Sequence, residues 1–584
     1  MPIDFRNTNS LWASVAVETL ARLGLQTAIL CPGSRSTPLT FAFANHPQIE
    51  ALPILDERSA AFFALGCAKR QHRPVAIVCT SGTAGANFYP AVIEACESGV
   101  PLLVFTADRP PEMRDCASGQ TIDQINLYGG FVKRFVEMMV PMADLSMLAY
   151  LRQTLVSGWE SAIALQPGPI HFNCPFRDPL PPIADDSTRV VKAGFDIGKF
   201  FYSVSASATT KVQAFLLTSL PIADWQQFET GIIVAGPADP SDPLSYCKTV
   251  SHLSQRLGWP VIAEGLSPLR NYSALNLALV STYDLILRDR DRAKKLVPQG
   301  VIQLGALPTS KVLRQWLSMH QPQRWIIGPQ RNLDPLHGPT RHLTLEIAAL
   351  IQTSSAVFPI ENSIYQQQWL TYEGEMRRAI REKMAAESTL VESKVVWLLS
   401  QHLPEQTPLF VANSMPVRDL ESFWLPNDRQ IQPVFSRGAN GIDGTLSTAM
   451  GLAHRNRPAV LLSGDLAFLH DTNGLLNTAQ IDGHLTVVLI NNGGGGIFEM
   501  LPVADFSPTF EKYFVTPQSV KFSYLCQAYG IEYRLVQTAE DLVKCIEVLP
   551  KQGIRVLEIG ADQHTSVAYR QQSVAQRKNL LNFL

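Results

Sequence analysis

A chain of 584 residues is too long for one hydrophobic core, and its length predicts three or four domains. Hydrophobic residues make up 46% of the chain and charged residues 17%, a balance that is typical of globular proteins and argues against long disordered regions. The formal net charge of −2 argues against a basic surface field, so neither nucleic acid nor an anionic membrane is an expected partner.

The cysteines and the N-terminus narrow the class of protein further. Nine cysteines, an odd number without a CxxC pair, disfavour both a disulfide framework and a structural zinc site. The first residues, MPIDFRNTNS, lack a basic region followed by an apolar core, and no apolar run is long enough to cross a membrane. We therefore expect a soluble, cytoplasmic protein.

The first part of the chain, from Ser10 to Arg177, alternates short β-branched runs with helical patterns. The expected strands are QTAILCPG, IEALPILDER, PVAIVCTSG, PLLVFTADRP and GPIHFNCP. Helical patterns lie between them, including SLWASVAVETLARLG and SAAFFALGCAKR. This alternation predicts a parallel sheet flanked by helices, followed by an exposed linker, PFRDPLPPIADDSTR, with a domain boundary near residue 185.

The remaining chain repeats the same alternation twice. Expected strands of the middle part are GIIVAGP, WPVIAEG, YDLILRD, GVIQLGA and RWIIGP. A long helical pattern from Ser363 to Gln401 precedes the third group, PLFVANS, RQIQPVF, RPAVLLSGD, LTVVLINN and GIRVLEIG. The fold class predicted is α/β, with three open parallel-sheet domains at 1–185, 190–355 and 360–584. Neither a G-x-G-x-x-G fingerprint nor a P-loop is present, which weakens a dinucleotide or P-loop nucleotide function.

Two strand ends in the third part carry oxygen ligands. RPAVLLSGD ends at Gly464 and Asp465, 25 residues intervene, and LTVVLINN ends at Asn491 and Asn492 before four glycines. A right-handed crossover places such strands side by side, so Asp465 and Asn492 are expected at one crevice. A carboxylate, an amide oxygen and a main-chain carbonyl suit Mg²⁺. The helix HDTNGLLNTAQ, expected to start near Asp471, would point its amides at a bound diphosphate.

Each dipeptide alone would indicate only a turn, but GD and NN at this spacing resemble the cofactor motif of the thiamine-diphosphate-dependent enzymes. The resemblance implies three domains: one that binds the pyrimidine, a central domain, and one that binds the diphosphate. It implies that Asp465, Asn492 and the Gly494 carbonyl hold Mg²⁺ or Mn²⁺. It also implies a homodimer or homotetramer whose sites lie at the subunit interface.

Thiamine chemistry needs a carboxyl group that exchanges a proton with the aminopyrimidine ring. Asp56 and Glu57 both follow the expected strand IEALPI, and their positions alone do not decide between them. A glutamate in the first turn of a helix is also favoured by the helix dipole. The family pattern matches Glu57, and the resemblance therefore implies that Glu57 is the catalytic acid.

Several long stretches are similar to one branch of this family, which acts in menaquinone and phylloquinone biosynthesis. These stretches are CPGSRSTPLTFAF, LDERSAAFFALGCAK, CTSGTAGANFYPAVIEA, TADRPPEMRDC, SRGANGIDGTLSTAMG and GDLAFLHDTNGLL. Members of this branch are transferases that decarboxylate 2-oxoglutarate and add the succinyl carbanion equivalent to isochorismate. Both substrates carry two carboxylates, which suit the bidentate fork of arginine.

The resemblance implies two sets of binding residues. Those for the cofactor are Glu57, Ser414, Ile442, Gly464, Asp465, Leu466, Asn492, Gly494, Ile497 and Phe498. Those for the substrates are Ser34, Arg35, Arg109, Gln120, Arg418 and Arg437. One arginine alone would more often be a solvated surface residue, and the apolar residues would more often be core.

Two positions depart from the pattern of the wider family. Leu466 follows Gly-Asp where many thiamine enzymes have glycine, and Gly119 stands where the best-known relatives have asparagine before the glutamine. Leu466 agrees with the pattern of the quinone-biosynthesis branch. Gly119 leaves undecided which residues contact isochorismate. Two alternatives remain: another 2-oxo acid carboligase that resembles acetolactate synthase and holds FAD, and a catalytically silent α/β scaffold.

Overall fold

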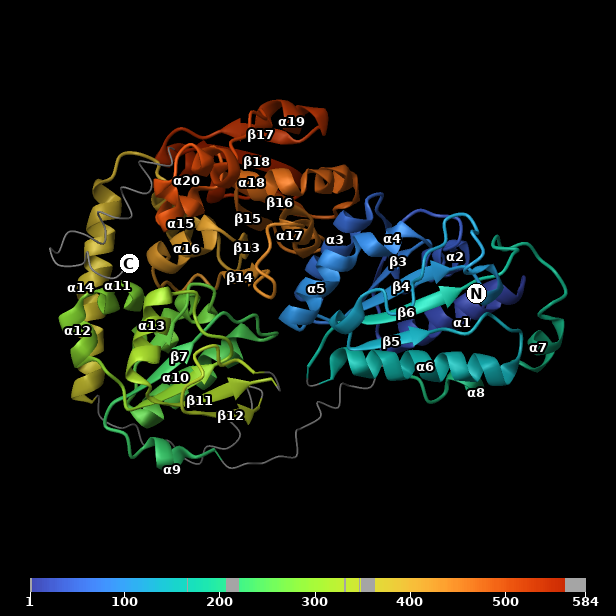
Figure 1. Ribbon diagram of the computed structural model, residues 1–584, viewed down its shortest axis with the longest axis horizontal. Helices are drawn as coiled ribbons and strands as arrows, with labels where there is room; N and C mark the ends of the chain where they lie inside the picture. Colours follow the sequence, from blue (N-terminus) through green and yellow to red (C-terminus); the bar gives the residue numbers. More distant parts are fainter. Residues whose placement is uncertain are drawn as a thin grey trace. The chain divides into compact units, whose positions relative to one another are not determined.

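The structure is a computed structural model that describes residues 3–164, 166–205, 220–329, 332–345, 347 and 363–561. It contains three six-stranded sheets, each with every strand pair parallel and with helices in the connections (Figure 1). These sheets confirm the predicted α/β fold class. The predicted domain limits near residues 355 and 360 lie outside the described residues, and the limits of the three domains stay a prediction.

The chain divides into two compact units. The first comprises residues 1–215, 436–456 and 469–483, and the second comprises 216–435, 457–468 and 484–584. Sheet 1 belongs to the first unit, whereas sheets 2 and 3 belong to the second.

Sheet 1 has the strand order β2-β1-β3-β4-β6-β5. Its strands are β1 (Thr27–Leu30), β2 (Glu50–Pro53), β3 (Val75–Cys79), β4 (Leu102–Asp108), β5 (Arg134–Glu137) and β6 (Ile170–Pro175). The helices around it are α1 (Thr8–Leu23), α2 (Thr37–Ala44), α3 (Glu57–Gln71), α4 (Thr83–Asn87), α5 (Tyr89–Ser98), α6 (Leu145–Ile163), α7 (Arg189–Gly194) and α8 (Ile197–Phe201). The five strands expected here are confirmed, and β5 is an additional edge strand.

The first unit also contains two elements from the third part of the chain, α17 (Thr445–Ala453) and the 3₁₀ helix η6 (Thr472–Gln480). Helix α17 packs closely on α3 because both helices have glycine at the crossing. A Cβ atom added at Gly66 would lie 2.0 Å from the carbonyl oxygen of Thr448, and one at Gly451 would lie 2.1 Å from that of Phe63. Helix α3, which begins at Glu57, is therefore fixed against α17.

Sheet 2 has the order β12-β11-β10-β7-β8-β9. Its strands are β7 (Gly231–Ala235), β8 (Val261–Ala263), β9 (Leu279–Val280), β10 (Gly300–Leu304), β11 (Gln323–Gly328) and β12 (Thr340–Thr344). The helices are α9 (Ile222–Trp225), α10 (Pro243–Leu257), α11 (Tyr283–Arg288), α12 (Arg290–Lys295), α13 (Lys311–His320) and α14 (Ile364–Ala386). Tyr365 and Trp369 of α14 share a hydrophobic cluster with Ile232 and Val234 of β7, so α14 packs on this sheet.

One predicted strand of the middle part is wrong. The run YDLILRD forms helix α11, and the strand that precedes it is the two-residue β9. Apolar residues at Tyr283, Ile286 and Leu287 are buried with helical spacing, a pattern that a short apolar run does not distinguish from a strand.

Sheet 3 has the order β14-β13-β15-β16-β18-β17. Its strands are β13 (Pro408–Val411), β14 (Gln432–Phe435), β15 (Ala459–Gly464), β16 (His484–Asn491), β17 (Glu532–Leu535) and β18 (Gly553–Gly560). The helices here are α15 (Glu392–His402), α16 (Met415–Phe423), α18 (Asp465–His470), α19 (Phe522–Ala528) and α20 (Ala539–Ile546), with the short helical turns η7 (Gly496–Met500), η8 (Pro502–Asp505) and η9 (Glu511–Val515). The single long helical pattern expected over 363–401 is two helices, α14 and α15.

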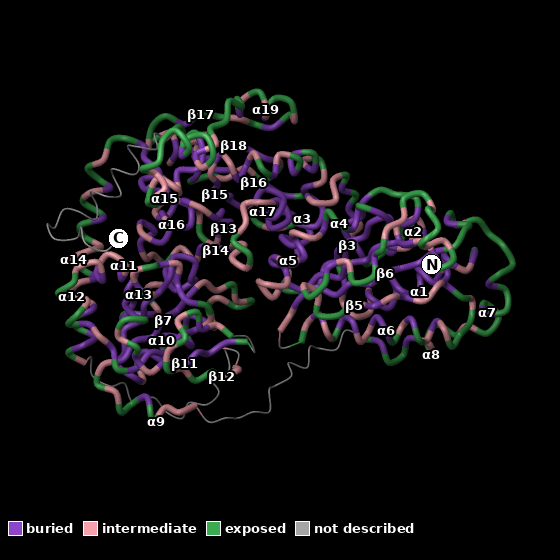
Figure 2. Tube along the Cα trace, in the orientation of Figure 1, coloured by how far each residue is buried: buried purple, intermediate pink, exposed green. Residues whose placement is uncertain are grey.

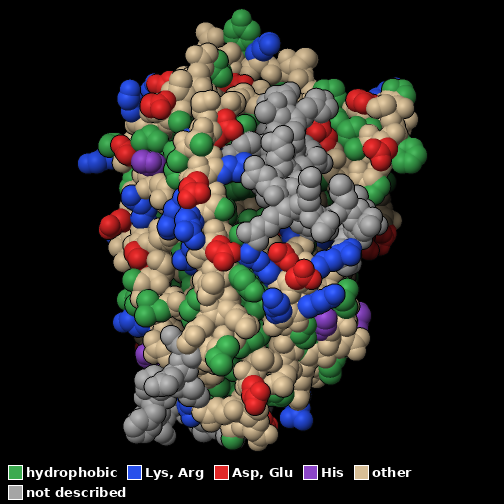
Figure 3. All heavy atoms as spheres, turned by 90° about the vertical axis from the view of Figure 1, so that its left-hand side faces the viewer, with side chains coloured by type: hydrophobic (Ala, Val, Ile, Leu, Met, Phe, Trp, Pro, Cys, Tyr) green, Lys and Arg blue, Asp and Glu red, His purple; other side chains and the backbone are tan. Residues whose placement is uncertain are grey.

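Burial follows this layered arrangement, because the central strands of the sheets are buried and the outer faces of many helices are exposed (Figure 2). On the face shown in Figure 3, Lys and Arg side chains lie among Asp and Glu side chains, in keeping with the net charge of −2. Among the described residues, no helix is both long enough and apolar enough to span a membrane.

Candidate active site

Asp465 and Asn492 lie at the C-terminal ends of the neighbouring strands β15 and β16. The two strands pair in parallel with Gly464 opposite Ile490, so the residues that follow reach the same edge of sheet 3. The Asp465 carboxylate accepts a hydrogen bond from the Leu466 amide at 2.8 Å and also interacts with the amides of Gly493 and Gly494. The structure therefore brings these two predicted ligands and the glycine run together.

The environment of Asp465 is unusual for a carboxylate. Asp465 is only 4% exposed, and this burial raises the pKa of Asp465 to about 6. The amide hydrogen bonds from Leu466, Gly494 and Gly493 lower the pKa and oppose this rise. The nearby charge of Glu392 raises the pKa further. A bound cation would relieve this accumulation of buried negative charge.

Asn492 contacts a residue that sequence reasoning missed. Its side-chain nitrogen Nδ2 donates a hydrogen bond of 3.0 Å to Oε1 of Glu392, and its oxygen Oδ1 accepts a 3.4 Å hydrogen bond from the Gly494 amide. Glu392 is the first residue of α15 and is 2% exposed. Nothing in the sequence marks it, because an acidic residue in the first turn of a helix is common.

The helix at this strand end differs from the predicted one. Helix α18 begins at Asp465 itself, and the segment expected to start a helix near Asp471 is the 3₁₀ helix η6. Asp471 is fully buried and accepts hydrogen bonds from the amide and hydroxyl of Ser447. Its carboxylate therefore belongs to the packing of η6 on α17.

The glycine run continues into a turn that strongly favours glycine. Gly494 has a φ of 142°, and a Cβ atom there would lie 2.3 Å from the carbonyl oxygen of Val515. Ile497 and Phe498 follow in η7, and the ring of Phe498 packs edge-on against Phe514 with 5.7 Å between ring centroids. Whether these two side chains wall a cofactor stays a prediction.

Ser414 and Arg418 lie at the start of α16, after strand β13. Ser414 has φ 73° and ψ −128°, a strained conformation for a residue other than glycine, and such strain clusters at functional sites. Its carbonyl accepts a 2.6 Å hydrogen bond from Arg418. At the other end of α16, the buried Arg270 donates to the carbonyls of Glu421 and Trp424 at 2.7 and 3.2 Å, which anchors the helix.

In the first unit, the structure separates the roles of the two adjacent acids after β2. The Asp56 carboxylate caps helix α3 through the Ser59 amide at 3.1 Å and accepts a 2.7 Å hydrogen bond from Asn473. Within the described part of the chain, the Glu57 carboxylate has neither a hydrogen bond nor an ion pair. Its charge acts on the thiols of Cys31 and Cys79, which follow β1 and end β3, and raises their pKa in addition to burial.

Substrate-binding candidates gather at the same edge of sheet 1. Arg109 follows β4 and donates hydrogen bonds to the hydroxyl of Ser81 and, at 2.8 Å, to the carbonyl of Gly119. Gln120 donates to the Ser81 carbonyl at 3.0 Å. Arg109 and Gln120 thus share contacts with Ser81, a residue that was not predicted, and Arg109 also contacts Gly119 directly.

Arg35 lies near this group and is buried, whereas Ser34 beside it is exposed. The Arg35 guanidinium donates to the Phe176 carbonyl at 2.9 Å, and its pKa is lowered by burial and by the charge of Arg109. The Nε atoms of both Arg35 and Arg109 are buried without a hydrogen-bond partner among the described residues. Two neighbouring cations with unused donors suit an anionic ligand.

The loop that carries Arg437 and Ile442 is held by a second residue that sequence reasoning missed. Both oxygens of the buried Glu94, on α5, accept main-chain amides: Gly438 at 3.0 Å and Ala439 at 2.7 Å. The Ile442 carbonyl accepts the hydroxyl of Thr445 at 2.7 Å, which begins α17. Contacts of the Arg437 and Ile442 side chains with ligands stay predictions.

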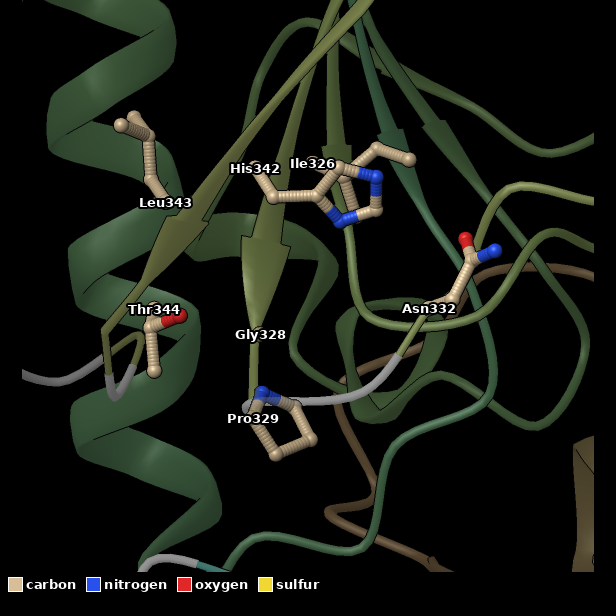
Figure 4. Close-up of a pocket in the computed structure, with 7 residues that line it drawn as sticks. All are labelled: Ile326, Gly328, Pro329, Asn332, His342, Leu343 and Thr344. Carbon is tan, nitrogen blue, oxygen red and sulfur yellow. The ribbon is translucent and has the colours of Figure 1, made fainter. Parts of the chain in front are cut away.

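A cavity of about 290 Å³ lies elsewhere, at the ends of β11 and β12, and is lined by Ile326, Pro329, Asn332, His342 and Thr344 (Figure 4). None of these is a predicted site residue. Among the described residues, no cluster of three or more His, Cys, Asp or Glu side chains could hold a metal. The predicted set of the Asp465 carboxylate, an amide oxygen and a main-chain carbonyl consists of donors of the kind that Mg²⁺ takes and would suit this ion.

Three family models match most of the chain. The thiamine pyrophosphate enzyme N-terminal TPP binding domain matches residues 12–127, the middle domain of thiamine pyrophosphate enzymes matches 205–411, and the C-terminal TPP binding domain matches 420–559. Sheet 1 overlaps the first match, and the strand ends at Asp465 and Asn492 lie within the third.

Curated relatives are similar over the full length. A 2-succinyl-5-enolpyruvyl-6-hydroxy-3-cyclohexene-1-carboxylate synthase of Nostoc sp. is 54% identical over 100% of this chain and 99% of its own. One of Gloeothece citriformis is also 54% identical, over 96% of this chain and 97% of its own. Among solved structures, benzoylformate decarboxylase from Polynucleobacter necessarius has the same fold, with a TM-score of 0.68 at 16% identity over 94% of this chain and 98% of that one. The chain therefore belongs to the thiamine pyrophosphate enzyme family, and within it to the 2-succinyl-5-enolpyruvyl-6-hydroxy-3-cyclohexene-1-carboxylate synthases.

Proposed function

We propose that this enzyme decarboxylates 2-oxoglutarate and adds the succinyl unit to isochorismate in a 1,4-addition. The product would be 2-succinyl-5-enolpyruvyl-6-hydroxy-3-cyclohexene-1-carboxylate. The observation that carries the proposal is the 54% identity to synthases of this name over essentially the whole chain. The acetolactate-synthase-like alternative is not favoured by these relatives, and the silent scaffold is not favoured by Glu57, Asp465 and Asn492.

The cofactor proposed is thiamine diphosphate with Mg²⁺ or Mn²⁺. When bound, it supplies a carbon centre that stabilises the negative charge left by loss of CO₂. Asp465, the Asn492 oxygen and the Gly494 carbonyl would hold the cation, and Gly464, Leu466 and Ser414 would contact the cofactor. The Glu57 carboxylate, which has no hydrogen bond or ion pair among the described residues, would exchange a proton with the aminopyrimidine ring, since Asp56 is already engaged by Ser59 and Asn473.

Arginines would bind the carboxylates of the two substrates. Arg35 and Arg109 lie close together and keep unpartnered Nε donors within the described residues, so an incoming carboxylate would gain hydrogen bonds that the protein does not make. Ser34 and Gln120 lie in the same region, and Arg418 and Arg437 would complete the set.

The proposed assignment places the enzyme in menaquinone or phylloquinone biosynthesis, as a homodimer or homotetramer with sites shared between subunits. Its test combines the purified protein with thiamine diphosphate, Mg²⁺ and 2-oxoglutarate, with and without isochorismate. We expect CO₂ release together with the coupled adduct by mass spectrometry when both substrates are present. Turnover of pyruvate without isochorismate, or a yellow FAD-containing protein, would instead support the acetolactate-synthase-like alternative.

A further inference from the structure

We propose that Glu392 is a positioning residue that fixes the side-chain amide of Asn492 with its oxygen toward the cation. The inference rests on the proposed function, because it concerns the cation of the thiamine diphosphate site. Glu392 lies about a hundred positions before Asn492 in the chain, on α15, and the two side chains meet only in the folded protein.

The orientation follows from hydrogen-bond chemistry. A terminal amide has one face that donates and one that accepts, whereas a carboxylate at neutral pH only accepts. The contact of 3.0 Å between Asn492 Nδ2 and Glu392 Oε1 is therefore possible only when the NH₂ group faces Glu392. The Asn492 oxygen then points away from Glu392, toward the Gly494 amide at 3.4 Å. A metal ligand of this type must present its oxygen, so the glutamate selects the competent rotamer.

Burial makes this selection strong. Glu392 is 2% exposed and Asp465 is 4% exposed, so water competes little for either carboxylate. The charge of Glu392 also acts on Asp465, which places it close to the predicted ligand set. An unengaged amide at Asn492 would be free to rotate and would present its NH₂ group to a cation in part of the molecules.

The test uses three variants and needs no catalytic activity. Glu392→Met fills the space without an acceptor, and Glu392→Gln keeps an acceptor oxygen without the charge. Glu373→Gln is the matched control, because Glu373 is a carboxylate of the same unit, 2% exposed, that binds Ser281 and Thr282 instead. The apparent Kd for Mg²⁺ is measured at fixed thiamine diphosphate by intrinsic tryptophan fluorescence, and the melting temperature of each apo-protein is recorded.

Loss of the acceptor is expected to raise the apparent Kd for Mg²⁺ by about 10- to 100-fold in Glu392→Met, the range typical of residues that orient metal ligands. Glu392→Gln should lose less affinity than Glu392→Met, because the glutamine oxygen can still accept from Asn492, but its NH₂ group can also donate and so no longer enforces the orientation. Glu373→Gln should bind Mg²⁺ as the wild type does, even where its melting temperature falls. Should Glu392→Met not fold, Glu392→Ala takes its place.

Two results would overturn the inference. One is a wild-type Kd for Mg²⁺ in Glu392→Met, and the other is an equal loss in Glu392→Met and Glu392→Gln, which would assign the effect to charge rather than to orientation. The variant Asp465→Ala distinguishes a failure of the inference on Glu392 from a failure of the proposed function. If the wild type binds thiamine diphosphate and Asp465→Ala does not, the cofactor site stands whatever Glu392 does, whereas a wild type that binds no thiamine diphosphate would reject the proposed function itself.

Discussion

At the scale of single residues, the adjacent acids Asp56 and Glu57 differ in their contacts, and this difference bears on which of them could be the catalytic acid. Asp56 satisfies the first turn of α3 and holds Asn473, so its carboxylate has partners on both oxygens. Glu57 is the next residue, and it has no such partner among the described residues. A carboxylate that must exchange a proton with a ligand needs this freedom, which favours Glu57 over Asp56.

The two acids are therefore expected to respond differently to substitution. Glu57→Gln should keep the affinity for thiamine diphosphate within about threefold and lower turnover by about 10²- to 10⁴-fold, the usual contribution of acid–base catalysis. Asp56→Ala should retain far more turnover but lose about 1 kcal/mol of stability, as removal of a helix cap does. Fluorescence titration of the cofactor and CO₂ release measure the two effects. Equal losses of turnover in both variants would contradict this division.

A buried histidine gives the first unit a defined pH response. His171, on β6, is fully buried beside Tyr128, and its Nε2 lies 2.7 Å from the hydroxyl of Thr106. Burial lowers the pKa of His171 to about 3 from the usual 6.5. The folded protein therefore resists a proton that the unfolded chain accepts below pH 6.5.

Stability of the apo-protein is expected to be unaffected by His171 above pH 6.5 and to fall, by about 1.4 kcal/mol per pH unit from this residue, as the pH drops toward 3. His171→Gln keeps a donor for Thr106 but does not titrate, so its urea midpoint should fall less between pH 7 and pH 5 than that of the wild type. His252→Gln, exposed on α10, is the control and should behave as the wild type. A wild-type pH dependence in His171→Gln would refute the assignment.

At the scale of elements, the loop at residues 436–441 is positioned by another helix rather than by its own strand. Glu94 on α5 accepts the amides of Gly438 and Ala439 and also the hydroxyl of Ser98 at 2.5 Å. The carboxylate thus orders the main chain next to Arg437. If Arg437 binds a substrate carboxylate, the position of its guanidinium group depends on the contact between Glu94 and this main chain.

Glu94→Gln replaces one accepting oxygen by an NH₂ group that faces a main-chain N–H donor. The lost hydrogen bond should lower the stability of the folded protein by about 1.5 to 3 kcal/mol. We expect the KM of at least one dicarboxylate substrate to rise by about tenfold or more, with thiamine diphosphate affinity unchanged. Steady-state kinetics with each substrate varied in turn measures the effect. Ser98→Ala, which removes only the hydroxyl that also binds Glu94, should leave KM near the wild-type value. Equal KM values for Glu94→Gln and wild type would show that the loop does not need this anchor.

Edge strands explain most of what sequence reasoning missed in the fold. The strands that were not predicted, β5, β9, β12 and β17, all lie at an edge of their sheets. An edge strand has one neighbour, so exposed and charged residues such as those of β12 and β17 are tolerated there and the apolar run disappears. The central strands are buried on both faces, and their continuous apolar runs made them predictable.

The candidate site was predictable for a related reason. Asp465 and Asn492 stand directly after two central strands, so the strand pattern alone brought them together. Glu392 and Glu94 act across the fold on residues far away in the chain, and no local pattern distinguishes them from ordinary helical glutamates. The proposed ligand-binding positions therefore follow a local pattern in the sequence, whereas the residues that contact them do not.

At the scale of the whole molecule, the predicted site residues fall on both compact units. Glu57, Arg35 and Arg109 belong to the first unit, and Asp465 and Asn492 belong to the second. The family resemblance implies that the pyrimidine end and the diphosphate end of one cofactor are bound by different subunits. A homodimer built in this way has two sites, each with Glu57 from one chain and Asp465 from the other.

Mixing two inactive variants tests this arrangement directly. Glu57→Gln and Asp465→Ala should each be nearly inactive as pure proteins, but a mixed dimer would contain one site with both residues intact and one with both changed. After random exchange of subunits, half of the dimers are mixed and one site in each works, so activity should recover to about a quarter of the wild-type value. Subunit exchange is verified with two differently tagged chains, and size-exclusion chromatography with light scattering gives the oligomeric state. If both residues of a site came from the same chain, every site in the mixture would carry one of the changes, and no activity would return.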